Sequence, residues 1–498
     1  MRRAHHRRCL VSHPEQVSPD GRALWTLGAD APSAVRSCGD EKDRDARVEG
    51  ARVTGPADPD GPGPRPTDVL HSPGYLRLLL TAGLLGLPLS LVAFAFLAVV
   101  HELEHVVWHD LPAALGHATP PPWWPVLTIG FAGLVVALAV LHLPGHGGHV
   151  PVAGLGAGAT PPAALPGVVL AAAASLVGGA VVGPEAPLVA IGSGLALLAI
   201  RRTSSGADPT TATLLAAAGS AAAISAIFGS PLVAAVIFLE VLGLSRRALM
   251  LVVLPCLVSS GVGALLFTGL GRWTGFEIGA LALPGLAPAR LTAAEVAWAL
   301  PLAVVVAVGT WVVCAVGRLT ARLAEAHVMT TTVVAGVVAG TAAAAYALMT
   351  GRSPEEVALS GQATLFDLAE DPAAWSTAAL VALVLCKAVA YAVCLGTFRG
   401  GPVFPAILLG AGVGVLAADL LPGLGLVAAL AIGMGAGMAV TGLPVTSVVL
   451  VALLLGDAAV DLVPVVILAV VVALVTEERL SSSSRLRVLV GAAPGPTT

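Results

Sequence analysis

The sequence predicts an all-α membrane protein that crosses the bilayer many times. Of its 498 residues, 56% are hydrophobic and only 11% are charged, and the mean hydropathy is +0.90. This composition is too apolar for a soluble globular protein. After the first 70 or so residues, the chain is long enough for more than about ten spans of roughly 20 residues each. One motif also occurs twice, far apart, which indicates two related halves. We therefore expect a multi-pass protein of the cell membrane that is surrounded by lipid.

Composition also limits the classes of partner. The net charge of −4 indicates no nucleic-acid partner. The six cysteines follow no metal-like spacing and lie partly inside apolar segments, so we interpret them as buried thiols. We expect no bound metal and no cofactor.

The first 72 residues differ from the rest of the chain. They carry eleven basic and eleven acidic residues among many Gly and Pro residues, which predicts a disordered N-terminal extension. No apolar segment follows the basic start of the chain, so a cleaved signal peptide is not expected. We place a first transmembrane repeat at 73–270, a second at 290–477 and a short polar tail at 478–498.

The first apolar segment begins near Tyr75, reaches about Val107 and contains His-Glu-Leu-Glu-His at 101–105. On a helix this spacing places two histidines one turn apart beside a glutamate, as in zinc proteases. One interpretation is an intramembrane protease that binds zinc through His101 and His105. The other is a helix end at the water interface, where these side chains are solvated. We favour the second, because the distant Asp motif of such proteases has no clear counterpart here.

A second apolar segment, Trp123 to Leu143, is followed by the Gly-rich break Pro144 to Pro151. Gly and Pro at this density interrupt a helix. A break that opens toward a new helix exposes backbone N–H groups, and these groups bind anions together with the helix dipole. The other interpretation, which this segment taken by itself favours, is an ordinary loop between spans.

The next break contains Glu185, which is the only Asp, Glu, Lys or Arg residue between Leu111 and Ile200. It follows the Gly/Ala-rich segment Leu165 to Val182, and Pro184 predicts that a new helix starts here. The helix dipole favours an acid in a first turn, so a structural role is one interpretation. An isolated acid inside a membrane, however, indicates a functional site.

The rest of the first half continues with apolar segments. Helices are expected at Leu214 to Phe228 and at Pro231 to Leu244, separated by a Gly break. Glu240 is a second isolated acid, but it lies close to Arg246 and Arg247, which indicates a structural role near the interface.

The second half repeats this order. Three spans are expected first, at Val296 to Ala315, Thr331 to Leu348 and Thr377 to Leu395. Between them, Ser353-Pro354-Glu355-Glu356 predicts a capping box. The pattern G-P-x-x-P-x-x-x-x-G-x-G of Gly183 to Gly194 then returns 218 residues later, at Gly401 to Gly412. If an odd number of spans separates the copies, the halves are inverted across the membrane.

The ordered set of motifs resembles the CLC family of chloride channels and chloride/proton antiporters, from about Tyr75 to Val475. Family members carry three filter motifs, G-S-G-I-P, G-K/R-E-G-P and G-x-F-x-P, at helix starts that face a shared anion. Here Gly183 to Pro187 is similar to the second, and Phe228 to Leu232 resembles the family sequence F-N-A-P-L. The resemblance implies two inverted repeats with broken, tilted helices, and transport of chloride or a similar small anion rather than an enzyme.

The other two filter motifs depart from the family pattern. Gly147 to Pro151 aligns with G-S-G-I-P, so that Gly148 replaces the anion-binding Ser and His149 replaces Gly. A neutral His149 can donate a hydrogen bond in place of the hydroxyl, whereas a protonated one adds charge and pH dependence. In the third motif, Pro402 has no N–H to offer, which leaves the next two amides.

By resemblance, Glu185 is the gating acid, whose carboxylate competes with the anion and moves away, or is protonated, to admit it. The anion-binding residues that the resemblance implies are Gly147, Gly148, His149, Val150, Gly183, Ala186, Val403 and Phe404.

The resemblance also bears on proton coupling. Family antiporters use an inner Glu, and Val241 stands at that position; they also use a Tyr near the carboxy terminus, where this chain has none. These differences favour a channel-like or weakly coupled carrier over a coupled chloride/proton antiporter. The resemblance further implies a homodimer with one pore in each subunit.

Overall fold

The computed structural model describes residues 73–156, 158–203, 208–242, 246–274, 281–287 and 289–482, and these are largely helical. The first half contains α2 (Pro73–His105), α3 (Leu111–Ala114), α4 (Trp124–His142), α5 (Leu165–Val177), α6 (Glu185–Thr203), α7 (Pro209–Phe228), α8 (Pro231–Leu242) and α9 (Arg246–Thr274). The second contains α10 (Ala293–Ala326), α11 (Val328–Thr350), α12 (Gln362–Glu370), α13 (Thr377–Thr397), α14 (Val403–Leu420), α15 (Leu426–Met438), α16 (Pro444–Leu455) and α17 (Ala459–Ser482). The predicted extension at 1–72 lies outside the described residues, as does the polar tail beyond Ser482.

Helix length and apolarity make the chain a multi-pass membrane protein. Within the described residues, eight helical segments are long and apolar enough to cross a membrane, and four more apolar helices are shorter. A short helix is tolerated at membrane depth where protein surrounds its ends, and α15 is buried along almost its whole length. The predicted all-α architecture with broken helices is confirmed.

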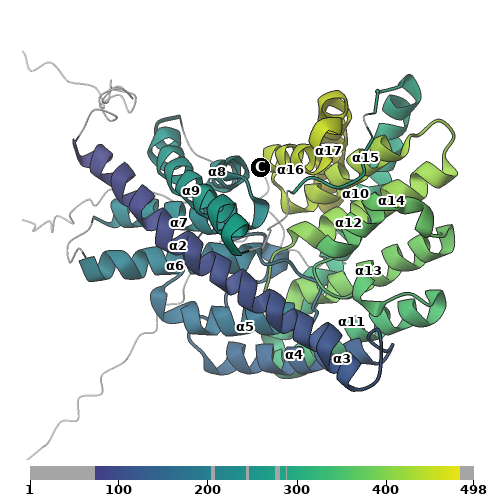
Figure 1. The fold of residues 1–498 in the computed structure, drawn as a ribbon, viewed down its shortest axis with the longest axis horizontal. Coiled ribbons are helices and arrows are strands. Elements are labelled where there is room, and N and C mark those ends of the chain that lie inside the picture. Colours follow the sequence, from purple (N-terminus) through teal and green to yellow (C-terminus); the bar gives the residue numbers. More distant parts are fainter. Residues whose placement is uncertain are drawn as a thin grey trace, which may run out of the picture. The chain divides into compact units, whose positions relative to one another are not determined.

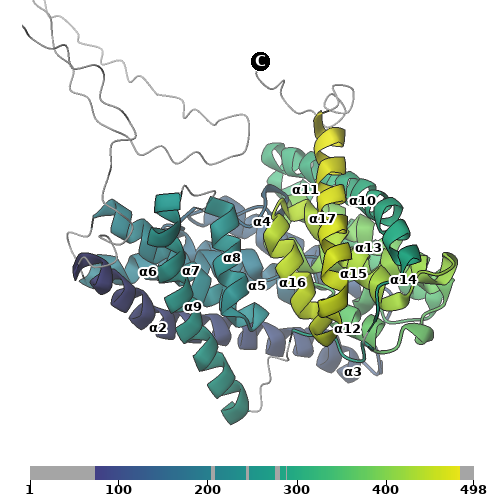
Figure 2. The same cartoon turned by 90° about the horizontal axis from the view of Figure 1, so that it is seen from above.

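The two halves share one pattern of helix contacts. In the first half α6 packs on α7, and α2 and α7 both pack on α9; in the second, α14 packs on α15, and α10 and α15 both pack on α17. Figure 1 shows α6 to α9, in blue and teal, on one side and α13 to α17, in green and yellow, on the other. The halves meet where α4 contacts α11 and where α8 contacts α16, and Figure 2 shows α8 beside α16.

Glycines of the repeated motif allow these helices to cross closely. A Cβ on Gly192 of α6 would overlap the carbonyl oxygen of Gly219 in α7. A Cβ on Gly410 of α14 would likewise overlap the carbonyl oxygen of Gly433 in α15. Small residues at such crossings let membrane helices approach until their backbones touch. Since Gly192 and Gly410 are equivalent positions of the motif, the motif has a packing role in both halves.

A second pair of equivalent breaks has the same local geometry in each half. Gly229 and Gly442 adopt left-handed conformations, with φ of 57° and 67°, and a glycine in this conformation ends a helix at little cost. Pro231 and Pro444 then begin α8 and α16, a position that suits proline because its missing N–H is not needed there.

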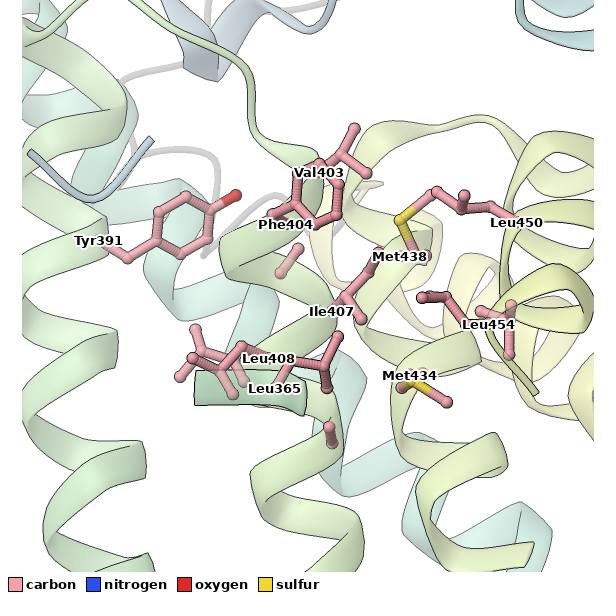
Figure 3. Packing of buried hydrophobic residues seen from close by; sticks show 14 of the residues in the cluster. Leu365, Tyr391, Val403, Phe404, Ile407, Leu408, Met434, Met438, Leu450 and Leu454 are labelled. Carbon is pink, nitrogen blue, oxygen red and sulfur yellow. The ribbon is translucent and has the colours of Figure 1, made fainter. Parts of the chain in front are cut away.

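The start of α14 is held in a densely packed part of the core. Val403 and Phe404 are each 1% exposed. Figure 3 shows Phe404 and Ile407 on α14, with Met438 of α15 and Leu450 of α16 nearby, all within one cluster of buried side chains. Interiors of this density deform little, so the backbone N–H groups at the start of α14 have fixed positions.

The predicted capping box at Ser353 was wrong. The Ser353 hydroxyl accepts from the Glu355 N–H on a short 3₁₀ turn, as a simple cap would. The Glu356 carboxylate does not return to the Ser353 backbone but accepts from the Arg352 Nε–H at 2.9 Å. Arg352 competes successfully because a charge-assisted bond is stronger than one to a neutral amide.

Candidate functional site

The two copies of the repeated motif meet in space. The Gly183 N–H donates to the Gly401 carbonyl with an N···O distance of 2.7 Å, and the Gly401 N–H donates back to the Gly183 carbonyl at 2.5 Å. This antiparallel bridge joins the segments that precede α6 and α14. The N-termini of two helices from different halves therefore lie at one point.

Glu185 lies at this junction and is fully buried, with 0% of its surface exposed. Its Oε1 accepts a hydrogen bond from the Phe404 N–H at 3.4 Å, while Oε2 has no hydrogen-bond partner among the described atoms. A buried acceptor without a partner costs stability. The carboxylate occupies a place where an anion would contact the same N–H, at a helix start that favours negative charge.

The first glycine of each motif copy makes room for this carboxylate. A Cβ at Gly183 or at Gly401 would overlap the oxygens of Glu185. Gly401 of the second copy thus leaves room for the Glu185 carboxylate, which only the first copy supplies.

Aromatic side chains hold the start of α14 against the junction. The Tyr391 hydroxyl donates to the Pro402 carbonyl at 2.7 Å, and Figure 3 shows it directed toward the start of α14. The Phe404 ring stacks on Phe228, with ring centroids 5.9 Å apart. Pro402 lacks an N–H, as the sequence indicated, and its contribution is the carbonyl that Tyr391 binds.

A small cavity adjoins the buried acid. Of the predicted residues, Gly147, His149 and Ala186 line it, together with Arg399 and Gly400. Ala186 directly follows Glu185 on α6, so the cavity and the carboxylate share one helix start. The remaining predicted residues do not line the cavity, and only some of them contact the Glu185 carboxylate. Gly183 and Phe404 contact the carboxylate, whereas Gly148, Val150 and Val403 neither line the cavity nor bond to Glu185.

The helix start that an anion site at the Gly-rich break requires does not form. Residues Gly145, His146, Gly147 and Gly148 adopt φ values of 79°, 49°, 73° and 90°, which is a left-handed turn that only glycine-rich sequence adopts readily. The Gly148 N–H donates to the Gly145 carbonyl at 2.9 Å. Only the 3₁₀ turn Pro151–Ala153 follows, and a single turn has almost no dipole. The loop interpretation is correct for this segment.

The surroundings of His149 bear on its charge. Loss of hydration in the crowded cavity lowers the pKa of His149, and the charge of Arg399 lowers it further, although hydrogen bonds that the imidazole donates to the backbone of Ala153 and Gly154 oppose this. A histidine with a lowered pKa is neutral near pH 7. This favours an uncharged His149, and a hydrogen bond from it to an anion stays a prediction.

The sequence analysis missed Arg399. It is the only Asp, Glu, Lys or Arg residue between Lys387 and Asp419, which is the same isolation that identified Glu185. A search for isolated residues of either charge would have found it.

Glu240 has a structural role, but with a partner that was not expected. Its carboxylate accepts from the Val445 N–H at 2.5 Å and from the Thr446 N–H at 2.7 Å. It thereby caps the first turn of α16 and ties α8 to that helix. Val241, at the position of the family's inner Glu, is half-buried beside it on α8.

The His-Glu-Leu-Glu-His segment forms the end of α2. His105 pairs with Asp110, with Nδ1 and Oδ2 3.5 Å apart, and the buried Trp108 donates to the Val177 carbonyl at 3.0 Å. Among the described residues, no group of three or more His, Cys, Asp or Glu side chains is placed to hold a metal ion. Nothing in this geometry supports the protease interpretation.

Comparison with known families adds to this geometry. The family model described as "Voltage gated chloride channel" matches residues 145–478, more than half of the chain. The chain belongs to this family. The matched segment includes all but the first residue of the Gly-rich break, Glu185 and the second motif copy.

Individual relatives show the same likeness. The chain is 29% identical over 367 residues to "Putative ion-transport protein YfeO" of Escherichia coli (strain K12 / DH10B), covering 71% of this chain and 82% of that protein. A slow cyanobacterial Cl⁻/H⁺ antiporter has the same fold, with a TM-score of 0.66 at 18% identity, over 83% of this chain and 97% of the other. A CLC-type fluoride/proton antiporter gives 0.57 at 16% identity, over 81% and 96%. The predicted fold of two inverted repeats is confirmed.

Proposed function

We propose that the chain moves chloride, or a similar small anion, across the membrane through a pore gated by Glu185. Family membership supports anion transport as the general activity. The observation that carries the gate is the position of one carboxylate, which is fully buried between the two motif copies and bonded to the Phe404 N–H. A group that takes the place of the anion must leave, or lose its charge, before the anion passes.

The anion site in this proposal is built mainly from backbone. The Phe404 N–H is fixed by the packed start of α14 and lies at the positive end of that helix. Gly147, His149 and Ala186 line the adjoining cavity. We assign no direct anion contact to the Gly148 N–H, because it is used within its own turn.

The proposed transport is channel-like or weakly coupled to protons. Val241 cannot carry a proton, and the tyrosine nearest the gate, Tyr391, donates its hydroxyl hydrogen to the Pro402 carbonyl. These two features support a pathway in which protons are not exchanged in a fixed ratio. The alternative is a coupled chloride/proton antiporter.

We further propose a homodimer with one pore in each subunit. Exposed apolar side chains on α8, α16 and α17 include Leu232, Val445 and Val460, and a membrane protein covers such surface with lipid or with a second copy. Light scattering of the detergent-purified protein, corrected for bound detergent, measures the number of chains. A monomeric particle contradicts the homodimer.

Simultaneous chloride and proton flux from liposomes tests the transport proposal, with the wild-type protein and Glu185→Ala. We expect chloride flux from the wild type with little or no fixed proton movement, and altered pH dependence in the variant. A constant proton-to-chloride ratio in the wild type overturns the channel-like interpretation. Absence of flux of any anion under all conditions overturns the proposed function itself.

A further inference from the structure

Arg399 is a buried cation in the wall of the cavity beside the gate. It stands between the end of α13 and the second motif copy, and only 9% of its surface is exposed. Its side chain lines the same cavity as Gly147, His149 and Ala186. The side chain comes from the second half of the fold, whereas Ala186 belongs to α6, the helix that carries Glu185.

The guanidinium group of Arg399 has N–H groups that make no hydrogen bond among the described atoms. Nη1 donates to the Thr397 carbonyl at 3.1 Å and to the Phe398 carbonyl at 3.3 Å, and Nη2 donates to the His146 carbonyl at 3.4 Å. Nε is buried and has no hydrogen-bond partner among the described atoms. Because a guanidinium carries five N–H groups, the Nε–H and the second N–H of Nη2 remain free. Nε and Nη2 share one edge of the planar group, from which a guanidinium donates two parallel N–H groups.

The Nε of Arg399 lies near Gly147, another residue that lines the cavity. Nε is 3.4 Å from the place that a Cβ on Gly147 would occupy, which is an ordinary van der Waals distance. The lining of the cavity thus combines a positive side chain with residues from the start of α6.

The charge of Arg399 has no counter-charge in the described part of the chain. No carboxylate there lies within 4.0 Å of the guanidinium, the limit for an ion pair. Taking an unpaired cation out of water is expensive, and a charged residue inside a membrane protein indicates function. An anion in the adjoining cavity supplies the missing charge.

We propose that Arg399 is a direct anion-binding residue, whose Nε–H and free Nη2–H hold a monovalent anion in the cavity beside Glu185. The inference rests on the proposed anion transport and adds to it a side-chain ligand. In the family form G-K/R-E-G-P a basic residue precedes the gating acid, and this chain has Pro184 there. Arg399, from the second half of the fold, places a positive charge near Glu185 in place of that basic residue.

The chemistry of the free edge defines the class of anion. Two parallel N–H groups on one edge fit chloride and also match the two oxygens of a planar oxyanion such as nitrate. A lysine at the same position keeps the charge but has no such edge. Arg399→Lys therefore separates the effect of charge from the effect of shape.

The competing explanation is structural, since Arg399 also holds three carbonyl groups of the surrounding loops. Calorimetric titration of the purified protein with potassium chloride and potassium nitrate distinguishes the two roles. Arg399→Gln removes the charge at similar size, and Arg290→Gln is the control, because Arg290 is an exposed loop arginine outside the cavity. Thermal unfolding without chloride or nitrate checks that each variant is folded.

For Arg399→Gln we expect a rise in the chloride Kd of about ten- to a hundredfold, the range for loss of a hydrogen bond to a charged group. Arg290→Gln should bind as the wild type does. For Arg399→Lys we expect chloride binding closer to the wild type but a clear loss of nitrate binding relative to chloride. This change of ratio would not follow from a structural role.

Two results overturn the inference. One is a folded Arg399→Gln protein with the wild-type chloride Kd; the other, decisive if that variant does not fold, is an Arg399→Lys protein with an unchanged nitrate-to-chloride ratio. In both cases chloride flux by the wild type leaves the proposed function standing. A wild-type protein that neither binds nor conducts any anion refutes the proposed function, and the inference with it.

Discussion

Replacing Glu185 by Gln removes the charge of the proposed gate and little else. The carboxylate is fully buried and bonded to the Phe404 N–H at 3.4 Å, so an anion on that N–H must displace it. Two unit charges about 4 Å apart repel each other by about 4 kcal/mol at an effective dielectric constant of about 20. This corresponds to nearly a thousandfold in affinity, since about 1.4 kcal/mol is a factor of ten.

The carboxylate can move further away and toward water, which reduces the repulsion. We therefore expect Glu185→Gln to bind chloride between about ten and a thousand times more tightly than the wild type above neutral pH. In the wild type, affinity should increase as the pH falls, because protonation neutralises the carboxylate and ends the repulsion. In Glu185→Gln the affinity should depend little on pH.

Calorimetric titration with potassium chloride between about pH 5 and about pH 8 measures both effects, over the range in which a perturbed carboxyl group titrates. Glu325→Gln is the matched control, because Glu325 is an exposed glutamate of α10. A folded Glu185→Gln protein that keeps both the wild-type affinity and the wild-type pH dependence would refute the role of Glu185 as gate.

Three further predictions follow from local geometry. Gly410→Ala should lower the free energy of unfolding by about 1–3 kcal/mol through overpacking, measured by thermal unfolding. Gly309→Ala is the control and should not lower it, since no atom lies within 4 Å of the place that a Cβ on Gly309 would occupy. Equal effects of the two substitutions contradict the packing argument. Burial, and then the neighbouring Glu356, raise the pKa of Glu355 to about 7. The folded state therefore binds the Glu355 proton more tightly than the unfolded state does, and stability falls as the pH rises from the pKa of the unfolded state through 7. Glu355→Gln should melt at a higher temperature than the wild type at alkaline pH and at a similar temperature at acidic pH, and the reverse order contradicts this. Because the pKa of His149 is lowered, His149→Asn should leave the pH dependence of chloride flux above pH 6.5 unchanged, and a flattened profile there would show that the histidine is charged.

Local patterns predicted the helices and their breaks. Hydropathy, the Gly and Pro positions and the isolation of Glu185 are properties of short segments, so α6 and α8 start where the sequence places them. The Gly-rich break shows the limit of this reasoning. Its composition correctly indicated an interruption, but it could not distinguish a new helix from a left-handed turn. That choice depends on a few φ angles near Gly147.

The sequence by itself determined that the chain is a membrane protein with two related halves and one exceptional acid. Only the tertiary structure decided which residues meet. Gly183 and Gly401 pair although they are 218 residues apart, and Arg399 lies in the cavity beside Glu185. Hydropathy and motif spacing are carried by neighbouring residues, whereas such meetings are set by how closely whole helices cross. The glycines at Gly192 and Gly410 permit that approach, and no local pattern reveals which backbone they touch.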